Sequence, residues 1–307
     1  MRLITLVIAV AMLGILTTSP AGGQEPNYSR EGADSCLKCH EEDVVLTLFK
    51  GAHANPTDPN GPFGHGQLKC EACHGPSGDH AGRVRRGKER PSPGAVFRSN
   101  SPTPVDTQNS QCMNCHTSDT GFGWHGNDHD INEIACTDCH TSHTAQDPVL
   151  VTSTQPEVCF DCHQQQRTQS LKPYAHPIRQ GKMDCGSCHS NHGATNDLQF
   201  VQQTLNDTCF DCHAEKRGPY LWEHAPVAED CGNCHDPHGS NHPGMLSMRG
   251  PMLCQSCHSQ AGHPSIPADG DGLPDMQPSQ FMLGQNCMNC HTQSHGSNHP
   301  SGSRLMR

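Results

Sequence analysis

Apolar and aromatic residues are scarce in this sequence. Of its 307 residues, 32% are hydrophobic and 4% are aromatic, whereas glycine occurs 30 times and proline 24 times. Such values are typical of disordered or loop-rich chains. They exclude an ordinary doubly wound enzyme, barrel or helical bundle, because each of these fills its core with many more apolar side chains.

Basic residues are also few. The chain has 20 Lys and Arg against 31 Asp and Glu, which gives a net charge of −11. An acidic chain without a basic stripe interleaved with aromatic residues is a poor partner for nucleic acid, so none is expected. The one basic run contains Arg83, Arg85, Arg86, Lys88 and Arg90. It is interpreted as a solvated surface that could also neutralise acidic cofactor groups or meet an acidic partner.

The first 23 residues resemble an export signal. Met1 and Arg2 precede an apolar run from Leu3 to Leu16, and small residues follow up to Gly23. This order is typical of a cleavable signal peptide, so residues 1–23 are expected to be removed. An uncleaved anchor is the alternative, although the run is shorter than the roughly 20 residues of a membrane span. The mature chain, residues 24–307, is expected to be exported and soluble.

Cysteine and histidine are abundant, with 20 and 24 residues. Every cysteine belongs to a C-x-x-C pair, and a histidine follows each of the ten pairs directly. The cysteines are Cys36, Cys39, Cys70, Cys73, Cys112, Cys115, Cys136, Cys139, Cys159, Cys162, Cys185, Cys188, Cys209, Cys212, Cys231, Cys234, Cys254, Cys257, Cys287 and Cys290. The histidines that follow are His40, His74, His116, His140, His163, His189, His213, His235, His258 and His291.

C-x-x-C-H is the attachment pattern of c-type haem. Two thiols form thioethers with the porphyrin vinyl groups. On a short helical turn the residues at i, i+3 and i+4 share one face, so the histidine reaches the iron. The chain is therefore expected to bind ten covalent haems, which would supply the missing core. Structural zinc or a disulfide scaffold are the alternatives, but neither requires a histidine after all ten pairs.

The motifs group into five dyads, each with two motifs, a histidine between them and a histidine after the second; we call these the intermediate and the trailing histidine. The dyads span about 36–80, 112–143, 159–193, 209–239 and 254–295. The predicted distal iron ligands are His53, His80, His129, His143, His176, His192, His224, His238, His263 and His295. Four choices stay open, since His65 competes with His53, His125 with His129, His242 with His238 and His299 with His295. A distal ligand can also come from a different dyad.

The expected fold is a multihaem cytochrome of loops and short helices packed around the haems, elongated and almost without sheet. Helices are predicted at 41–50, 157–169 and 208–216, the last capped by Asn206 or Asp207. Residues 91–108 are predicted to form a loop. An iron with two histidines has no open position for a substrate. The histidine supply therefore favours electron transfer over catalysis, and no catalytic residues are predicted.

The ten motifs, the repeated CFDCH blocks, the block DPHGSNHP at 236–243 and the ending CMNCHTQSHGSNHPSG at 287–302 resemble the periplasmic decahaem cytochromes of the MtrA/DmsE family. The resemblance implies iron with two histidines and a periplasmic location at the outer membrane. It also implies a place inside an outer-membrane β-barrel protein. A polar, loop-rich chain cannot cross lipid unaided, whereas a wide barrel with a polar lumen can hold it. The implied partners are periplasmic or inner-membrane donor cytochromes and an extracellular cytochrome or terminal reductase.

Three functions compete. The first is a conduit between periplasm and cell exterior, which would serve metal or dimethyl sulfoxide reduction with outward flow, or Fe(II) oxidation with inward flow. The second is a multihaem reductase, which needs at least one iron without a distal histidine or with an unusual proximal ligand. The third is a soluble periplasmic electron shuttle without a barrel.

Overall fold

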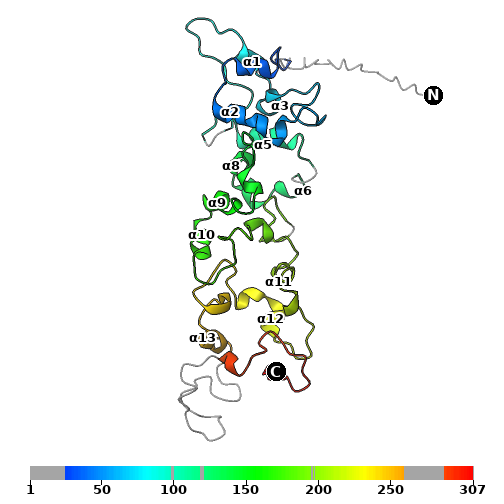
Figure 1. Cartoon of the computed structure of the whole chain (residues 1–307), viewed down its shortest axis with the longest axis vertical. Helices are drawn as coiled ribbons and strands as arrows, with labels where there is room; N and C mark the ends of the chain where they lie inside the picture. The colour runs from blue at the N-terminus through cyan, green and yellow to red at the C-terminus, as the bar shows by residue number, and fades with distance from the viewer. Residues whose placement is uncertain are drawn as a thin grey trace, which may run out of the picture.

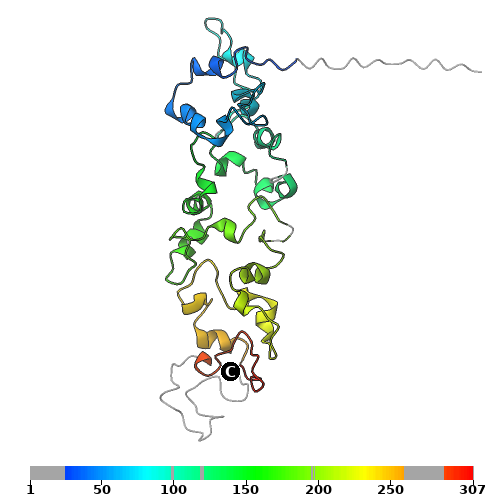
Figure 2. The same cartoon turned by 45° about the vertical axis from the view of Figure 1, so that its right-hand side comes forward.

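The computed structural model describes residues 25–97, 100–117, 121–194, 196, 198–258 and 287–306. The predicted signal peptide and His263 lie outside these ranges. The molecule is elongated, as predicted: the chain descends from α1, α2 and α3 at one end to α13 and the C-terminus at the other (Figures 1 and 2). Sequence order and position along the long axis therefore agree.

The helices are short, and α5, the longest, has 9 residues. The α-helices of the described residues are α1 Ala33–Leu37, α2 Asp43–Thr47, α3 Cys70–His74, α4 Gly78–Ala81, α5 Val105–Met113, α6 Gly121–Trp124, α7 Asp128–Ile131, α8 Cys136–Cys139, α9 Gln155–Phe160, α10 Gln164–Ser170, α11 Leu205–Phe210, α12 Ala225–Glu229 and α13 Gly250–Gln255. The 3₁₀ turns are η1 Leu48–Lys50, η2 Ala52–Ala54, η3 Pro148–Leu150, η4 Cys185–Ser187, η5 Ala214–Lys216, η6 Cys231–Asn233, η7 Pro243–Met245 and η8 Cys287–Asn289. No helix of the described ranges combines the length and apolar character that crossing a bilayer demands.

Within the described residues there is no β-strand, which confirms the expected near-absence of sheet. Four isolated bridges occur, and they join Tyr174 to Ser240, His189 to Phe200, Trp222 to Ser297 and His235 to Leu246. The bridges of Tyr174 and Trp222 connect one dyad to the next.

The helix predictions need two corrections. The helix expected at 157–169 is two helices, α9 and α10, because the chain leaves α9 at the motif turn and His163 has non-helical torsions. The helix expected at 208–216 begins earlier, at Leu205. Its cap is Thr204, whose hydroxyl accepts a hydrogen bond from the Asp207 backbone at 3.0 Å. The region 41–50 is helical through α2 and η1, as predicted, whereas the predicted loop at 91–108 ends where α5 begins at Val105.

The protein core is small. The buried apolar residues are Ala33, Leu48, Ala95, Trp124, Ala135, Val149 and Phe160, and no large side chain is completely buried among the described residues. A continuous cavity of about 4340 Å³ occupies the space that a core would fill, with lining residues from Ala52 to Met306. The chain therefore encloses space along its length instead of packing against itself.

Candidate haem sites

Each C-x-x-C-H motif forms one helical turn. In nine of the motifs the histidine N–H donates to the carbonyl of the first cysteine at 2.8–3.0 Å, and in the remaining one His74 ends α3, which begins at Cys70. The turn brings both thiols and the imidazole to one side, as the i, i+3, i+4 spacing predicts. All 20 cysteines lie within the described residues, and none forms a disulfide.

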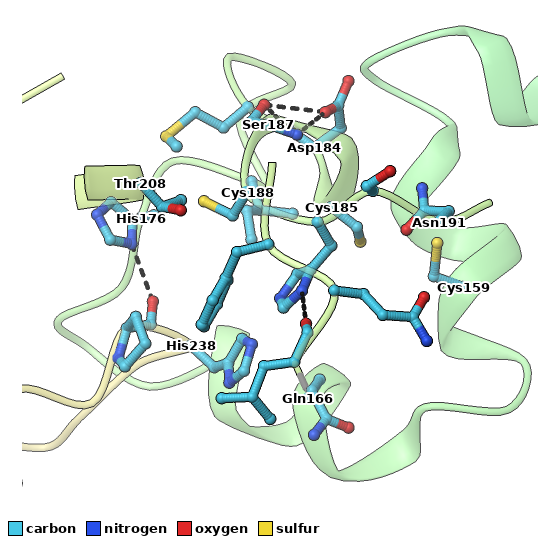
Figure 3. Close-up of a pocket in the computed structure, with 18 of the residues that line it drawn as sticks. Cys159, Gln166, His176, Asp184, Cys185, Ser187, Cys188, Asn191, Thr208 and His238 are labelled. Carbon is cyan, nitrogen blue, oxygen red and sulfur yellow. Dashed lines mark hydrogen bonds between the residues drawn. The ribbon is translucent and has the colours of Figure 1, made fainter. Parts of the chain in front are cut away.

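The cavity is lined by cysteine and histidine. Seventeen of the cysteines line it, all except Cys36, Cys39 and Cys70. Figure 3 shows one part of it, where Cys185, Cys188 and His238 surround the same space. The turn that carries these cysteines is held by Asp184, whose carboxylate accepts hydrogen bonds at 2.9 Å from both the backbone N–H and the hydroxyl of Ser187.

The imidazoles lie in pairs. Nine pairs have ring centres 5.9–6.4 Å apart, and each joins a motif histidine to one predicted distal ligand. The pairs are His40–His80, His116–His53, His74–His143, His163–His129, His140–His192, His213–His176, His189–His238, His258–His224 and His235–His295. Two metal–imidazole bonds of about 2 Å, with each ligand nitrogen about 1 Å from its ring centre, place the two centres about 6 Å apart.

The Nδ1 atoms point away from the pairs. In eight imidazoles Nδ1 lies 2.7–3.2 Å from a backbone carbonyl oxygen, which is the geometry of a donated hydrogen bond. These are His74, His80, His129, His176, His189, His224, His235 and His291. A histidine that binds a metal through one nitrogen usually donates from the other, which fixes its tautomer. Nε2 is thereby left with its lone pair.

Burial favours the neutral imidazole at several predicted distal positions. It lowers the pKa of five of these histidines below the ordinary value, with smaller contributions from neighbouring histidines. The five are His53, His143, His192, His238 and His295. Burial also raises the pKa of the Cys73 thiol to about 11. Since iron binds the neutral form of histidine, the environment prepares these side chains for coordination.

The motifs follow one another in space in sequence order. Within each dyad the thiols of the two leading cysteines lie close enough to shift the pKa of one another; the pairs are Cys36–Cys70, Cys112–Cys136, Cys159–Cys185, Cys209–Cys231 and Cys254–Cys287. Between dyads the last cysteine of one interacts with a cysteine of the next; the pairs are Cys73–Cys112, Cys139–Cys159, Cys188–Cys212 and Cys234–Cys257. The ten attachment sites therefore form a single row.

The pairing of imidazoles crosses from dyad to dyad. The intermediate histidine faces the first motif of the following dyad, as in His53–His116, His129–His163, His176–His213 and His224–His258. The trailing histidine faces the second motif of the preceding dyad, as in His143–His74, His192–His140, His238–His189 and His295–His235. The first dyad has no predecessor, and its trailing His80 faces His40 of the same dyad.

The intermediate histidine of one dyad is hydrogen-bonded to the backbone of the segment that carries the trailing histidine of the next dyad. Nδ1 of the intermediate histidines His129, His176 and His224 lies 2.9–3.2 Å from the carbonyl oxygen just before the next trailing histidine. A glycine follows each trailing histidine at these junctions. Gly239 shows why: its φ is +136°, and a Cβ there would collide with the carbonyl oxygen of Gln169 in the preceding dyad.

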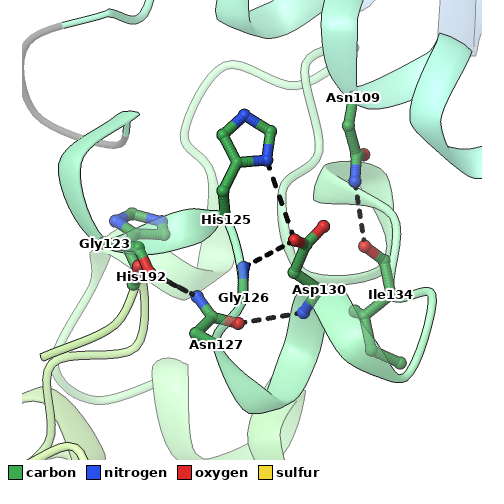
Figure 4. Close-up of polar contacts among 8 residues, drawn as sticks. All are labelled: Asn109, Gly123, His125, Gly126, Asn127, Asp130, Ile134 and His192. Atoms are coloured by element: carbon green, nitrogen blue, oxygen red, sulfur yellow. Dashed lines mark hydrogen bonds and ion pairs between the residues drawn. The ribbon is translucent and has the colours of Figure 1, made fainter.

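The histidines that compete for a distal position lie in different surroundings. Figure 4 shows His125 beside Asp130, 3.7 Å from its carboxylate and mostly exposed, while Asn127 donates to the His192 carbonyl at 2.9 Å. His129, and not His125, faces a motif imidazole. His53 and His295 likewise face motif imidazoles, whereas their competitors His65 and His299 are exposed.

The last competing pair is His238 and His242. His238 faces His189, whereas its competitor His242 is half-buried and also lines the cavity. His263 lies outside the described residues, so its role stays a prediction.

Some residues of the site carry no obvious sequence signal. Asn109, which is 3% exposed, donates to the Ile134 carbonyl at 3.1 Å and accepts from the Cys136 backbone at 2.8 Å. Asn206 holds Cys231 in the same way at 2.7 Å. Each asparagine stands three residues before the first cysteine of its dyad, so the recurrence of this offset is the signal that could have found them.

Comparison with known proteins agrees with this geometry. Residues 176–218 and 224–263 match the model of a doubled CXXCH motif, and residues 70–156 match a cytochrome c-type protein NrfB-like model. The chain is 46% identical over 286 residues to the multiheme cytochrome MtrA of Shewanella baltica, covering 92% of this chain and 84% of that protein. It belongs to the MtrA family of multihaem cytochromes.

A more distant similarity links the chain to NrfB. The cytochrome c-type protein NrfB of Escherichia coli is 32% identical over 177 residues, which cover 54% of this chain and 86% of that protein. NrfB of Haemophilus influenzae is 27% identical over 159 residues, covering 45% of this chain and 67% of that protein.

As a member of the MtrA family, the chain is an electron-transfer cytochrome that binds ten c-type haems covalently through its ten motifs. The geometry fits this cofactor in three ways: the motif turns present two thiols each, the cavity runs along the row of motifs, and the paired imidazoles leave the space of one metal ion between them.

Proposed function

We propose that this protein is an electron conduit in which every haem iron has two axial histidines. The motif histidines serve as proximal ligands, and the histidines that face them serve as distal ligands. The nine described imidazole pairs are the observation that carries the proposal. His263 and His291 complete the set for the tenth iron.

The chain's own residues position the row and close it to substrates. Imidazoles on both sides of a metal leave no free coordination position, and the Nδ1 hydrogen bonds hold the rings in that orientation. When bound, haem supplies a one-electron couple at each position of the row. The protein therefore has the features of a carrier of electrons and not of an enzyme.

The cellular role follows the family resemblance. We infer that the protein works in the periplasm at the outer membrane, within a β-barrel protein that shields its polar, loop-rich surface from lipid. Periplasmic or inner-membrane cytochromes would exchange electrons at one end, and an extracellular cytochrome or terminal reductase at the other. The proposal covers outward flow to metals or dimethyl sulfoxide and inward flow from Fe(II).

Spectroscopy of the haem-loaded protein tests the coordination. We expect low-temperature EPR to show low-spin iron throughout, and carbon monoxide to leave the reduced spectrum unchanged. A high-spin signal together with a carbon monoxide shift would show an open iron and favour a reductase.

A vesicle assay separates the conduit from a soluble shuttle. The protein is reconstituted with its outer-membrane barrel protein in liposomes that contain reduced methyl viologen, and ferric citrate is added outside. We expect the internal dye to be oxidised only when both proteins are present. Oxidation that does not depend on the barrel protein, or a failure of the two proteins to copurify, would support the shuttle instead.

A further inference from the structure

His140 differs from the imidazoles described above in its hydrogen-bond partner. Eight imidazoles donate from Nδ1 to neutral backbone carbonyls, whereas His140 Nδ1 lies 2.7 Å from Oδ2 of Asp147. His140 follows the fourth motif and faces His192 across 5.9 Å. A carboxylate at hydrogen-bond distance thus stands behind this motif imidazole, whereas the carboxylate oxygens nearest Nδ1 of His40 and His213 lie farther away, at 3.8 Å (Glu42) and 3.7 Å (Glu215).

Asp147 is held firmly in this position. Its side chain is 13% exposed, and its Oδ1 accepts hydrogen bonds from the backbone of Thr141 at 3.2 Å and of Val149 at 3.4 Å. The second of these caps η3, where Pro148 follows Asp147 directly. The backbone bonds occupy Oδ1 and orient Oδ2 toward the imidazole.

We propose that Asp147 is a positioning residue that lowers the reduction potential of the iron held by His140. A carboxylate that accepts the Nδ1 proton makes the imidazole a stronger electron donor to its metal. Stronger donation stabilises the ferric form, and hydrogen bonding around the ligands is one of the means by which proteins set haem potentials. The couple is a one-electron reduction of Fe(III) to Fe(II), with no bond made or broken. The inference rests on the proposed role of His140 as an axial ligand.

The position within the row gives this effect a consequence. The fourth motif lies inside the row, between Cys112 of the third motif and Cys159 of the fifth, with both of which its thiols interact. A lower potential at this site raises the free energy of an electron there, whichever direction the electron travels.

The test uses the haem-loaded full chain with the substitutions Asp147→Asn and Asp147→Ala. Asparagine keeps an acceptor for the imidazole N–H but removes the charge, while alanine removes both. Glu133→Gln is the matched control, because it removes the charge of an exposed carboxylate three residues before the fourth motif. The readouts are a potentiometric titration fitted with ten one-electron components and the low-spin EPR g-values.

We expect one of the ten components to move to higher potential in both Asp147 variants, with a change in the g-values of one low-spin iron. Glu133→Gln leaves all g-values as in the wild type. Unchanged titration and g-values in Asp147→Asn would overturn the proposal. So would a high-spin signal from one iron in both variants, because Asp147 would then only hold the ring in place. An open iron in the wild type would instead contradict the proposed function, which separates the two failures.

Discussion

At the residue scale, the hydrogen bond from Nδ1 sets the orientation of the imidazole ring. A free histidine can bind metal through either nitrogen, and a donated hydrogen bond from Nδ1 selects Nε2. In His176 and His224 the acceptor belongs to the following dyad, at 2.9 Å in both cases. The same hydrogen bond therefore orients the ligand and joins two dyads.

The neighbouring histidines His125 and His129 give a matched pair for testing ligand identity. Because His129 faces His163 and His125 lies against Asp130, we expect His129→Ala to open one iron in ten. Carbon monoxide should then shift about one tenth of the Soret absorbance, and EPR should gain a high-spin signal. His125→Ala should behave as the wild type. An opened iron in His125→Ala alone would reverse the assignment.

At the scale of elements, the junction between dyads depends on a glycine. Gly239 and Gly244 both have positive φ, +136° and +67°, but only at Gly239 would a Cβ meet the backbone of another dyad; nothing lies within 4 Å at Gly244. Alanine at Gly244 meets only the cost of the left-handed torsion, whereas alanine at Gly239 meets the collision and a torsion that it adopts even less readily. We expect Gly239→Ala to reduce the free energy of unfolding by about 1–3 kcal/mol more than Gly244→Ala.

Guanidinium unfolding followed by far-ultraviolet circular dichroism measures this difference. The haem content of both variants serves as the control for normal maturation. Equal losses in the two variants would mean that the dyads do not depend on close contact at Gly239.

The elements show what sequence can and cannot predict. The motif turns follow from spacing alone, and each predicted distal histidine of the described residues does face a motif histidine. The sequence does not show which dyad a distal histidine serves. The spacing of His53 from its own motifs, for example, gives no indication that His53 faces His116 of the next dyad. The start of α11 was missed because Thr204 and Asp207 form a reciprocal cap, with Thr204 Oγ1 2.7 Å from the Asp207 carboxylate. Asp207 looked like a cap but occupies the third helical position.

At the scale of the whole molecule, the chain has too small a core to fold alone. The described residues bury only small apolar groups apart from a few such as Trp124 and Phe160. Without covalent haem, too little apolar surface is buried to offset the conformational entropy that the chain loses on folding. We expect the mature chain expressed without haem attachment to give the circular dichroism of a coil and a radius of gyration of about 60 Å by X-ray scattering. A compact haem-free chain would contradict this dependence on the cofactor.

Charge is also unevenly distributed over the molecule. The net charge is −11, yet five exposed cations, Arg83, Arg85, Arg86, Lys88 and Arg90, follow α4 at the N-terminal end. Arg90 joins this run to the first haem site, because its guanidinium donates to the carbonyl of His80, and His80 faces His40. An anionic redox reagent should therefore exchange electrons preferentially at this end.

Replacing Arg83, Arg85 and Arg86 with glutamine tests the prediction. In stopped-flow oxidation of the reduced protein at low salt, we expect ferricyanide to react roughly 3–10-fold more slowly with the variant, because attraction raises local reagent concentration. Cationic hexaammineruthenium(III) should react somewhat faster, and both differences should fade at high salt as charges are screened. The control replaces Lys172, Arg179 and Lys182, which removes the same net charge from the middle of the row. If the control slows ferricyanide equally, net charge alone governs the rate and the N-terminal cations give no preferred entry to the first haem.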